Sequence, residues 1–252
     1  MMDLNADLGE SFGRWTLGDD ERLVKHITSA NLACGFHAGD FRVMETTVAL
    51  CRQARVAVGA QPGYPDLIGF GRRPMPFDPG EVEALVRYQI GALEAFCRAS
   101  GVEMQHVKPH GALYNQAAAD PALAAAIARA TSRFSRDLAL YGLASSEPMA
   151  SAAEDAQLRY VPEAFADRRY LGDGSLQPRT EPGSVLADPE AAAAQAVSIA
   201  TEGHVVAANG DRVTLTAESI CCHGDTPGAV EIAAAVRLAL GTAGVAVAAL
   251  RP

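Results

Sequence analysis

Short apolar segments of this chain alternate with longer segments in which apolar residues recur at helical spacing. The short segments predict strands over 2–7, 29–33, 56–60, 105–108, 137–141, 159–162 and 219–222. The longer segments predict helices over 19–26, 40–55, 82–99, 122–134, 147–155, 190–201 and 227–240. An Asp-Pro pair, which supplies a side-chain cap and a residue suited to the first turn, precedes three of the helices, at 78–79, 120–121 and 188–189. The alternation predicts one α/β domain over 1–252, a barrel of seven strand–helix units.

Three segments interrupt this alternation. Residues 205–215 alternate around Asn209-Gly210-Asp211, which predicts a β-hairpin that decorates the barrel. Residues 64–77 and 171–185 are rich in Gly and Pro, which predicts two long loops. Long loops inside a compact domain are usually lids or binding loops. We therefore expect both loops to lie near a functional site.

Polar residues that can carry chemistry gather where the apolar runs end. The clusters are 5–10, 31–37, 61–66, 108–111, 163–168 and 223–225. In a β/α barrel the carboxyl ends of all strands open onto one face. We therefore expect one cavity that is faced by Asp7, His37, Lys108, His110 and His223.

Composition narrows the class of protein. The net charge of −9 argues against nucleic acid as a partner, because neutralising phosphates requires a basic face. No apolar run reaches the roughly 20 residues of a membrane span, and the start of the chain has no basic segment of a signal peptide. The five cysteines form an odd set, and Cys221 and Cys222 are adjacent. These features predict a protein of the reducing cytoplasm with no membrane partner.

Two carboxylates close the first predicted strand. Asp7 and Glu10 can act as metal ligands, or as a general base with a partner that orients it. Asn5 shares one side of the strand with Asp7, which favours a joint role. The alternative is that Asp7 caps the next helix.

A histidine follows the second predicted strand between two glycines. Gly35 and Gly39 predict a bent backbone that brings His37 close to another group. Asp40 is expected to cap the following helix. Cys34 has small and apolar neighbours, which predicts a buried, unreactive thiol.

The segment Lys108-Pro109-His110-Gly111 is the sharpest local signal. Proline stiffens the turn and glycine permits close approach of the chain, so the strand end is held rigidly. A buried lysine is costly unless it meets an anion, such as a carboxylate, a phosphate or a developing oxyanion. The alternative is a solvated Lys108 and a hydrogen-bonded loop histidine.

Charged residues also follow the last two barrel strands. Arg168 can fork onto a carboxylate or phosphate, although ion pairs among Glu163, Asp167, Arg168 and Arg169 would explain that cluster equally well. His223 is expected in the site, whereas Asp225 has the alternative role of capping the last helix. Three further histidines are expected to be structural or exposed: His26, His106 in the core, and His204.

Familiar cofactor motifs are absent. The sequence has neither the Cys-x-x-Cys nor the His-Glu-x-x-His spacing of zinc sites, and it has no P-loop. Gly69-Phe70-Gly71-Arg72-Arg73 is rich in glycine but does not join a strand directly to a helix. A dispersed metal site remains possible, with the candidate ligands Asp7, His37, His110 and His223.

Several long motifs in order resemble the LamB/YcsF family, essentially from end to end. They are DLNADLGESFG (3–13), ACGFHAGD (33–40), VKPHGALYN (107–115), FADR (165–168), PR (178–179) and CHGD (222–225). The resemblance implies a seven-stranded β/α barrel akin to the glycoside hydrolase and deacetylase folds. One departure stands at Gln61, where the family often has histidine, so a metal-binding or titrating role at this position is in doubt.

The resemblance also implies an activity. It is cleavage of the lactam of 5-oxoproline to glutamate coupled to ATP hydrolysis by a 5-oxoprolinase, in which this chain would be the A subunit beside the B and C subunits. ATP would be a co-substrate with Mg, a divalent metal is possible in the chain itself, and the chain can form a homo-oligomer. Asp7 would activate water, alone or through a histidine, and Lys108 would stabilise developing charge.

We assign the candidate residues to two groups. The catalytic candidates are Asp7, His37, Lys108 and His110. The substrate-binding candidates are Asn5, Glu10, Asn31, Gln61, Tyr64, Asp66, Arg72, Glu163, Arg168 and His223. Two other functions stay open, a metal-dependent deacetylase of N-acetylated carbohydrate and a regulatory subunit without catalytic activity.

Overall fold

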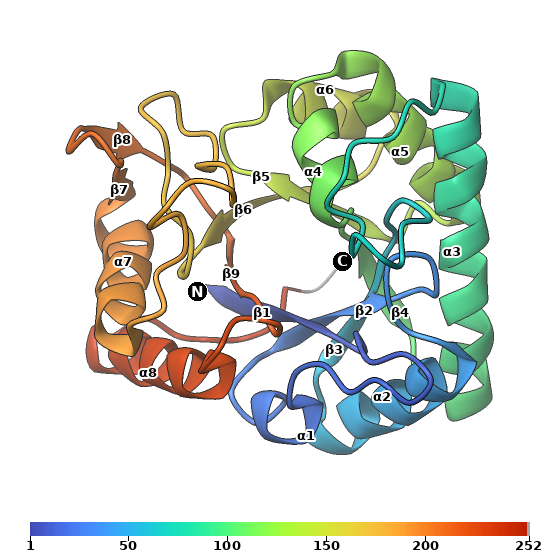
Figure 1. Ribbon diagram of the computed structural model, residues 1–252, viewed down its shortest axis with the longest axis horizontal. Helices are drawn as coiled ribbons and strands as arrows, with labels where there is room; N and C mark the ends of the chain where they lie inside the picture. Colours follow the sequence, from blue (N-terminus) through green and yellow to red (C-terminus); the bar gives the residue numbers. More distant parts are fainter. Residues whose placement is uncertain (251–252) are drawn as a thin grey trace.

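Seven parallel strands form a closed barrel in the computed structural model, which describes residues 1–250 (Figure 1). Their order is β1-β2-β3-β4-β5-β6-β9. The strands are β1 (Asp3–Leu8), β2 (Ser29–Ala33), β3 (Ala57–Gln61), β4 (Met104–Val107), β5 (Ala139–Leu143), β6 (Tyr160–Phe165) and β9 (Ser219–Cys222). The predicted seven-stranded β/α barrel is confirmed.

Helices surround the barrel and cover its outer face (Figure 1). They are α1 (Asp20–Leu23), α2 (Phe41–Ala54), α3 (Pro79–Ser100), α4 (Gly111–Ala117), α5 (Pro121–Phe134), α6 (Glu147–Asp155), α7 (Pro189–Glu202) and α8 (Ala229–Thr242). The side chains of Asp40, Asp78, Asp120 and Asp188 accept hydrogen bonds from the first turns of α2, α3, α5 and α7. None of the helices within residues 1–250 combines the length and the apolar character that a membrane span requires.

Two differences from the predicted pattern bear on the site, besides a shorter α1 and a β5 that lies two residues later than predicted. Helix α4 was not predicted, because its seven residues, Gly111–Ala117, are too few for a clear helical period. Strand β6 continues past Pro162 to Phe165, so Glu163 lies inside the strand and does not follow it. The sequence pattern ended this strand at proline because proline removes a hydrogen-bond donor.

A two-stranded antiparallel sheet lies outside the barrel. It consists of β7 (His204–Val206) and β8 (Arg212–Thr214), with the turn at Asn209-Gly210-Asp211. Figure 1 shows the pair next to the end of α7, away from the centre of the barrel.

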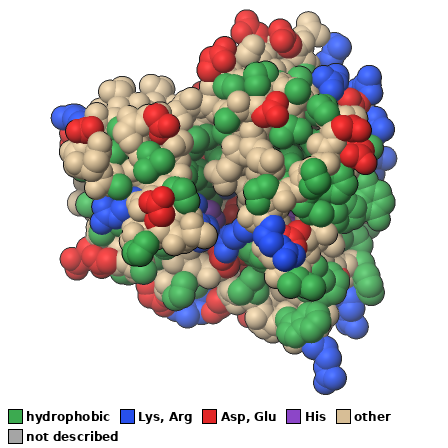
Figure 2. All heavy atoms as spheres, turned by 45° about the horizontal axis from the view of Figure 1, so that its top comes forward, with side chains coloured by type: hydrophobic (Ala, Val, Ile, Leu, Met, Phe, Trp, Pro, Cys, Tyr) green, Lys and Arg blue, Asp and Glu red, His purple; other side chains and the backbone are tan. Residues whose placement is uncertain are grey.

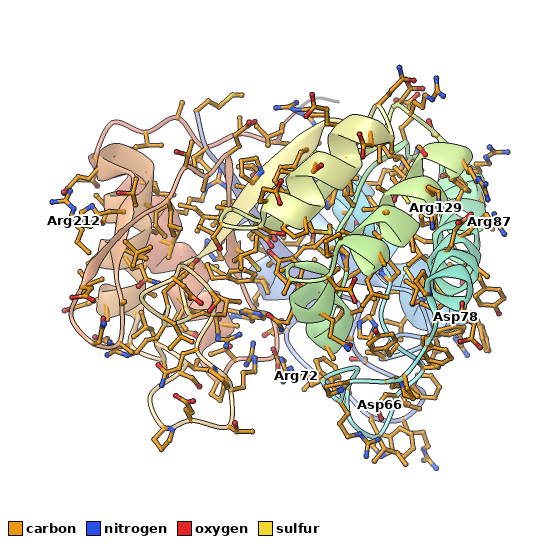
Figure 3. The ribbon with its side chains drawn as sticks, turned by 90° about the horizontal axis from the view of Figure 1, so that it is seen from above. Asp66, Arg72, Asp78, Arg87, Arg129 and Arg212 are labelled. Carbon is orange, nitrogen blue, oxygen red and sulfur yellow. The ribbon has the colours of Figure 1, made fainter. Side chains whose placement is uncertain are left out.

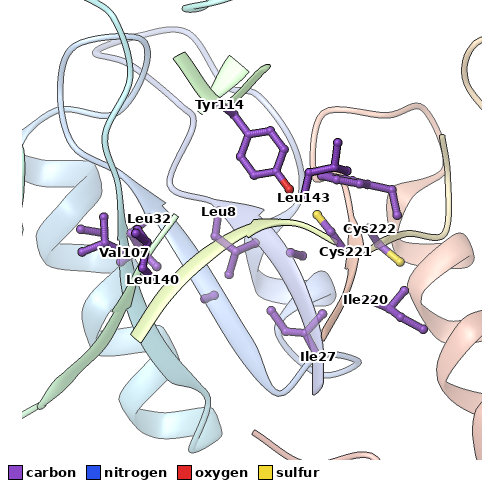
Figure 4. Close-up of a cluster of buried hydrophobic side chains, with 14 of the residues drawn as sticks. Leu8, Ile27, Leu32, Val107, Tyr114, Leu140, Leu143, Ile220, Cys221 and Cys222 are labelled. Atoms are coloured by element: carbon purple, nitrogen blue, oxygen red, sulfur yellow. The ribbon is translucent and has the colours of Figure 1, made fainter. Parts of the chain in front are cut away.

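Alternation along the strands separates an apolar layer from a polar interior. Leu8, Leu32, Val107, Leu140 and Ile220 come from five barrel strands and belong to one buried apolar cluster (Figure 4). In β1 the residues between the apolar ones, Asp3, Asn5 and Asp7, are equally buried but are hydrogen-bonded to other strands. Buried polar groups require such partners, so the barrel interior is a hydrogen-bonded network.

His106 on β4 is part of this interior network. Its Nε2 lies 2.8 Å from Oδ1 of Asn31, and its ring stacks on Tyr141 with 4.3 Å between centroids. Gly59 provides the room, because a Cβ there would lie 2.1 Å from Nε2 of His106. The prediction of a satisfied core histidine is confirmed.

We expect His106 to make the fold sensitive to acid. Burial, then the charge of Lys108, lowers the pKa of His106 to about 3. Between pH 6.5 and about 3 the unfolded chain therefore binds a proton that the folded chain does not, and stability falls as pH decreases. At pH 5 the loss from this group is about 2 kcal/mol.

Urea unfolding of the wild type and of His106→Gln at pH 7.5 and pH 5 measures this contribution. The free energy of unfolding of the wild type is expected to fall more steeply toward acid than that of the variant. Parallel pH dependences in the two proteins would show that His106 is protonated readily in the folded state.

Candidate active site

A cavity of about 910 Å³ opens at the carboxyl ends of the barrel strands. Several residues predicted for the site line it: Asp7, Gln61, Arg72, Lys108, His110, Arg168 and His223. The loop 171–185 and the start of α4 complete its wall. Figure 2 shows a hollow near the middle of this view with Lys and Arg side chains at its border.

Lys108 is at the bottom of the cavity, in contact with two carboxylates. Its Nζ lies 2.7 Å from Oε1 of Glu163 and 3.3 Å from Oδ1 of Asp7. Oδ1 of Asn5 at 3.2 Å and Sγ of Cys221 at 3.1 Å are also within reach. Burial alone would lower the pKa of Lys108, but the negative charges around it hold that pKa well above its ordinary value. Four acceptors share three protons, so Lys108 has no proton left over for a ligand.

The carboxylate of Asp7 is ionised. Burial raises its pKa, but the charge of Lys108 and then that of His223 outweigh burial, and the net pKa lies below the ordinary value. Asn31 donates to Oδ1 of Asp7 at 2.9 Å. Asp7 caps no helix, and the N-cap of α1 is Asp19.

Asn5, Asn31 and Glu163 lie beneath the cavity and not on its wall. Asn5 donates to Glu163 at 2.8 Å, and Asn31 donates to Asn5 at 2.7 Å. The hydroxyl of Tyr114 on α4 donates to the second oxygen of Glu163 at 2.9 Å, and Tyr114 also lines the cavity. Asn5, Asn31 and Glu163 therefore position Asp7 and Lys108 through direct contacts and do not line the cavity themselves. Tyr114 was not predicted, because its helix was not.

His223 at the end of β9 is oriented by Asp167. Its Nδ1 lies 2.9 Å from Oδ1 of Asp167, whose carboxylate also accepts from the backbone of His223 and from Thr226. Burial raises the pKa of Asp167, but the charge and hydrogen bond of His223 outweigh it and lower that pKa. In the neutral form of the imidazole, N–H at Nδ1 faces Asp167, and the lone pair of Nε2 is free in the cavity.

The ion pairs envisaged within 163–169 are not formed. Glu163 pairs with Lys108, and Asp167 pairs with His223. Arg168 donates to the backbone carbonyls of Ser184 and Gln177. Asp225 does not cap α8, whose N-cap is Gly228, and instead pairs with Arg72 at 2.8 Å.

His37 stacks face to face on His110, which lines the cavity, whereas His37 itself is fully buried and does not line it. Their centroids are 3.8 Å apart and their planes differ by 5°. Gly63 and Gly71 leave space for the pair, since a Cβ at either would lie within 2.7 Å of His37. Nε2 of His110 lies 2.9 Å from the carbonyl oxygen of Phe70, which requires N–H there and leaves Nδ1 as an acceptor.

Burial shifts the pKa of both histidines and of the nearby Glu10 toward their neutral forms. Burial lowers the pKa of His110 to about 3, and burial and then His110 hold the pKa of His37 well below its ordinary value. Burial, then the charges of Asp7 and Asp225, holds the pKa of Glu10 well above its ordinary value. Among the described residues, both ring nitrogens of His37 and Oε1 of Glu10 have no hydrogen-bond partner.

A metal ion does not fit the histidine pair as it is arranged. Glu10, His37 and His110 have ligand atoms within 4.8 Å of one another, the one such group of three within residues 1–250. A metal about 2 Å from an imidazole nitrogen lies near the plane of that ring. Two parallel rings stacked at 3.8 Å cannot both contain one ion in their planes. Of the other candidate ligands, Asp7 faces Lys108, and His223 faces Asp167 through Nδ1 while its Nε2 stays free.

The remaining predicted residues lie on the segment after β3. The amide of Gln61 lines the cavity and has no hydrogen-bond partner among the described residues. Tyr64 stacks on Phe77, away from the cavity wall. Asp66 pairs with Arg73, and Figure 3 shows Asp66 on the same loop as Arg72, which lies nearer to the middle of the molecule. The structure thus places Gln61 and Arg72 on the cavity wall, and Tyr64 and Asp66 away from it.

These features describe a seven-stranded β/α barrel with a charged cavity at the carboxyl ends of its strands. The chain belongs to the LamB/YcsF family, whose model matches residues 2–252.

Two relatives of similar length have the same name. A protein from Symbiobacterium thermophilum that is named as the A subunit of 5-oxoprolinase is 54% identical over 250 residues, which cover 98% of this chain and 94% of that protein. One of the same name from Chloroflexus aggregans is 53% identical over 246 residues, covering 98% and 97%.

Solved structures agree with the fold. The crystal structure of a lactam utilization protein from Thermus thermophilus matches with a TM-score of 0.93 and 48% identity over 99% of both chains. A putative cellobiose-phosphate cleavage protein from Enterococcus faecalis has a TM-score of 0.53 and 15% identity over 98% of this chain and 96% of that one, a likeness of fold alone.

Proposed function

We propose that this chain is the A subunit of an ATP-dependent 5-oxoprolinase, which opens the lactam of 5-oxoproline to glutamate while ATP is hydrolysed. The names of its full-length relatives support the activity. The structural observation that supports a hydrolytic activity is His223, which lines the cavity and is hydrogen-bonded to Asp167. An oriented imidazole with a free nitrogen is suited to take a proton from water.

Activation of the lactam explains the need for ATP. A cyclic amide resists attack by water, and transfer of a phosphoryl group from ATP to the lactam oxygen turns that oxygen into a leaving group. The sequence has no P-loop, so we assign nucleotide binding, with Mg, to the two partners, the B and C subunits. The cavity of this chain then receives the activated ring.

Within the cavity, His223 is the residue that activates water. Its Nε2 takes the proton as water adds to the activated carbon, and the imidazolium returns a proton to the ring nitrogen as the carbon–nitrogen bond breaks. The product of this step is an acyl phosphate of glutamate, and its hydrolysis by a second water releases glutamate and inorganic phosphate. Asp7 is a weaker base, because the positive charge of Lys108 lowers its pKa. Asp7 and Lys108 contribute a fixed pair of charges at the cavity floor.

Association with other chains is part of the proposal. Trp15, Phe41 and Ile68 expose 72%, 69% and 95% of their surface. A partner protein, or a second copy of this chain, that covers these side chains would remove their apolar surface from water. A deacetylase that uses a metal is less well supported, because the stacked histidines do not fit a shared ion.

Co-expression with the two partner subunits tests the function. We expect glutamate from 5-oxoproline in the presence of ATP, little without ATP, and little from the purified chain alone. Robust ATP-dependent turnover by the single chain would contradict the dependence on partners. Release of acetate from an N-acetylated sugar without ATP, and no glutamate from the complex, would favour the deacetylase.

A further inference from the structure

One cation on the cavity wall, Arg179, has no partner among residues 1–250. Four Lys and Arg side chains line the cavity, namely Arg72, Lys108, Arg168 and Arg179. The first three bind Asp225, the carboxylates of Glu163 and Asp7, and two backbone carbonyls, respectively. Within residues 1–250, Arg179 has no hydrogen bond or ion pair that would neutralise it, and its Nη2 is fully enclosed.

Arg179 is half-buried, and the enclosed Nη2 of its guanidinium lacks a partner, which is costly. It carries five N–H donors, and burial of a charge is compensated only by an opposite charge or by hydrogen bonds. Three acids act on Arg179 from nearby, and each is paired with another group: Asp225 with Arg72 through Oδ2, Asp167 with His223, and Asp7 with Lys108. Burial, then the charge of Arg72, lowers the pKa of Arg179, which reports the same unfavourable surroundings. An anion in the cavity would supply what Arg179 lacks.

The protein holds Arg179 in place from both sides. Arg168 donates to the carbonyl of Gln177 at 2.6 Å and to that of Ser184 at 3.3 Å, so one side chain fixes the loop before and after Arg179. The backbone of Arg169 adds hydrogen bonds with the same two residues. Arg179 is therefore a side chain on a fixed segment, and the role of Arg168 is to hold that segment.

A second unpartnered atom narrows the chemistry of the ligand. Gln177, two residues before Arg179, also lines the cavity, and its Oε1 is enclosed without a hydrogen-bond partner among the described residues. An amide oxygen requires a donor. A ligand that satisfies both residues carries an anion close to an N–H group, as 5-oxoproline does with its carboxylate next to the ring nitrogen.

We propose that Arg179 binds the carboxylate of a cyclic amino acid lactam and that Gln177 accepts a hydrogen bond from its ring N–H. This inference rests on the proposed function and adds the residues that select the substrate. A lactam without the carboxylate leaves Arg179 unpaired, and such a site rejects an analogue that lacks the recognised group.

Calorimetric titration of the purified chain tests the assignment. The wild type is expected to bind 5-oxoproline about 10–100-fold more tightly than 2-pyrrolidinone, the same ring without the carboxylate. Arg179→Met is expected to remove this preference, and Arg179→Lys to restore part of it. Arg87→Met is the matched control and should keep the full preference, because Arg87 lies on the outer face of α3, away from the cavity (Figure 3).

The outcomes separate this inference from the proposed function. No binding or no preference in the wild type, or an unchanged preference in Arg179→Met, would overturn the role of Arg179. Tight binding of inorganic phosphate that Arg179→Met abolishes, without a preference for 5-oxoproline, would assign the site to a phosphoryl group instead. A wild-type chain that prefers 5-oxoproline, within a complex that releases no glutamate, would overturn the proposed function alone.

Discussion

Replacing His223 by glutamine is expected to slow glutamate release by the assembled complex about 10²–10⁴-fold, the usual contribution of a general base. Glutamine cannot take the proton of the attacking water, but it can still donate to Asp167. The effect should therefore fall on kcat, with little change in KM for 5-oxoproline. Steady-state rates at saturating ATP, with 5-oxoproline varied, measure both constants.

Two further variants sharpen this prediction. Asp167→Asn is expected to reduce kcat as well, because an amide no longer holds the imidazole with its proton at Nδ1. His204→Gln, on the hairpin outside the barrel, should retain full activity. A His223→Gln complex with wild-type kcat would place the water-activating group elsewhere.

Replacing Lys108 by methionine is expected to destabilise the barrel by about 3–5 kcal/mol. The change removes the only positive charge in contact with two buried carboxylates, those of Asp7 and Glu163, among the ion pairs of the described residues. Urea unfolding at pH 7 gives the free energy directly. Lys25, the other lysine of the chain, is exposed, and Lys25→Met serves as the matched control.

The double variant Lys108→Met with Glu163→Gln tests whether charge is the cause. Removal of the facing carboxylate is expected to recover about 0.5–3 kcal/mol of the loss, the range for residues in direct contact. A Lys108→Met variant as stable as the wild type would show that the carboxylates are protonated in the fold. If the losses in free energy of unfolding of Lys108→Met and Glu163→Gln simply add in the double variant, packing and not charge is the cause.

The barrel could be predicted from the sequence because the period of a strand and the period of a helix both depend on neighbouring residues only. Alternating strands and helices, and aspartates before helices, depend on residues within one segment. The convergence of Asp7, Lys108, His110 and His223 followed from a topological rule for strand ends. These features needed no knowledge of which side chains touch.

Contacts between distant strands could not be predicted in the same way. The pairing of Glu163 with Lys108, and of Asp167 with His223, depends on how the closed barrel places β6 between β5 and β9. Arg179 sits in an irregular loop, where no period points to a cavity. The sequence pointed to Arg179 only through the Pro178-Arg179 motif of the family, and the fold was needed to place this residue on the cavity wall.

A crystal structure of the chain with 5-oxoproline tests most directly whether the cavity of this barrel is the site of ring opening. The account predicts the ring inside the 910 Å³ cavity, with its carboxylate on Arg179 and its carbonyl carbon facing Nε2 of His223. A 5-oxoproline molecule bound outside this cavity, or with its carbonyl carbon turned away from His223, would contradict it.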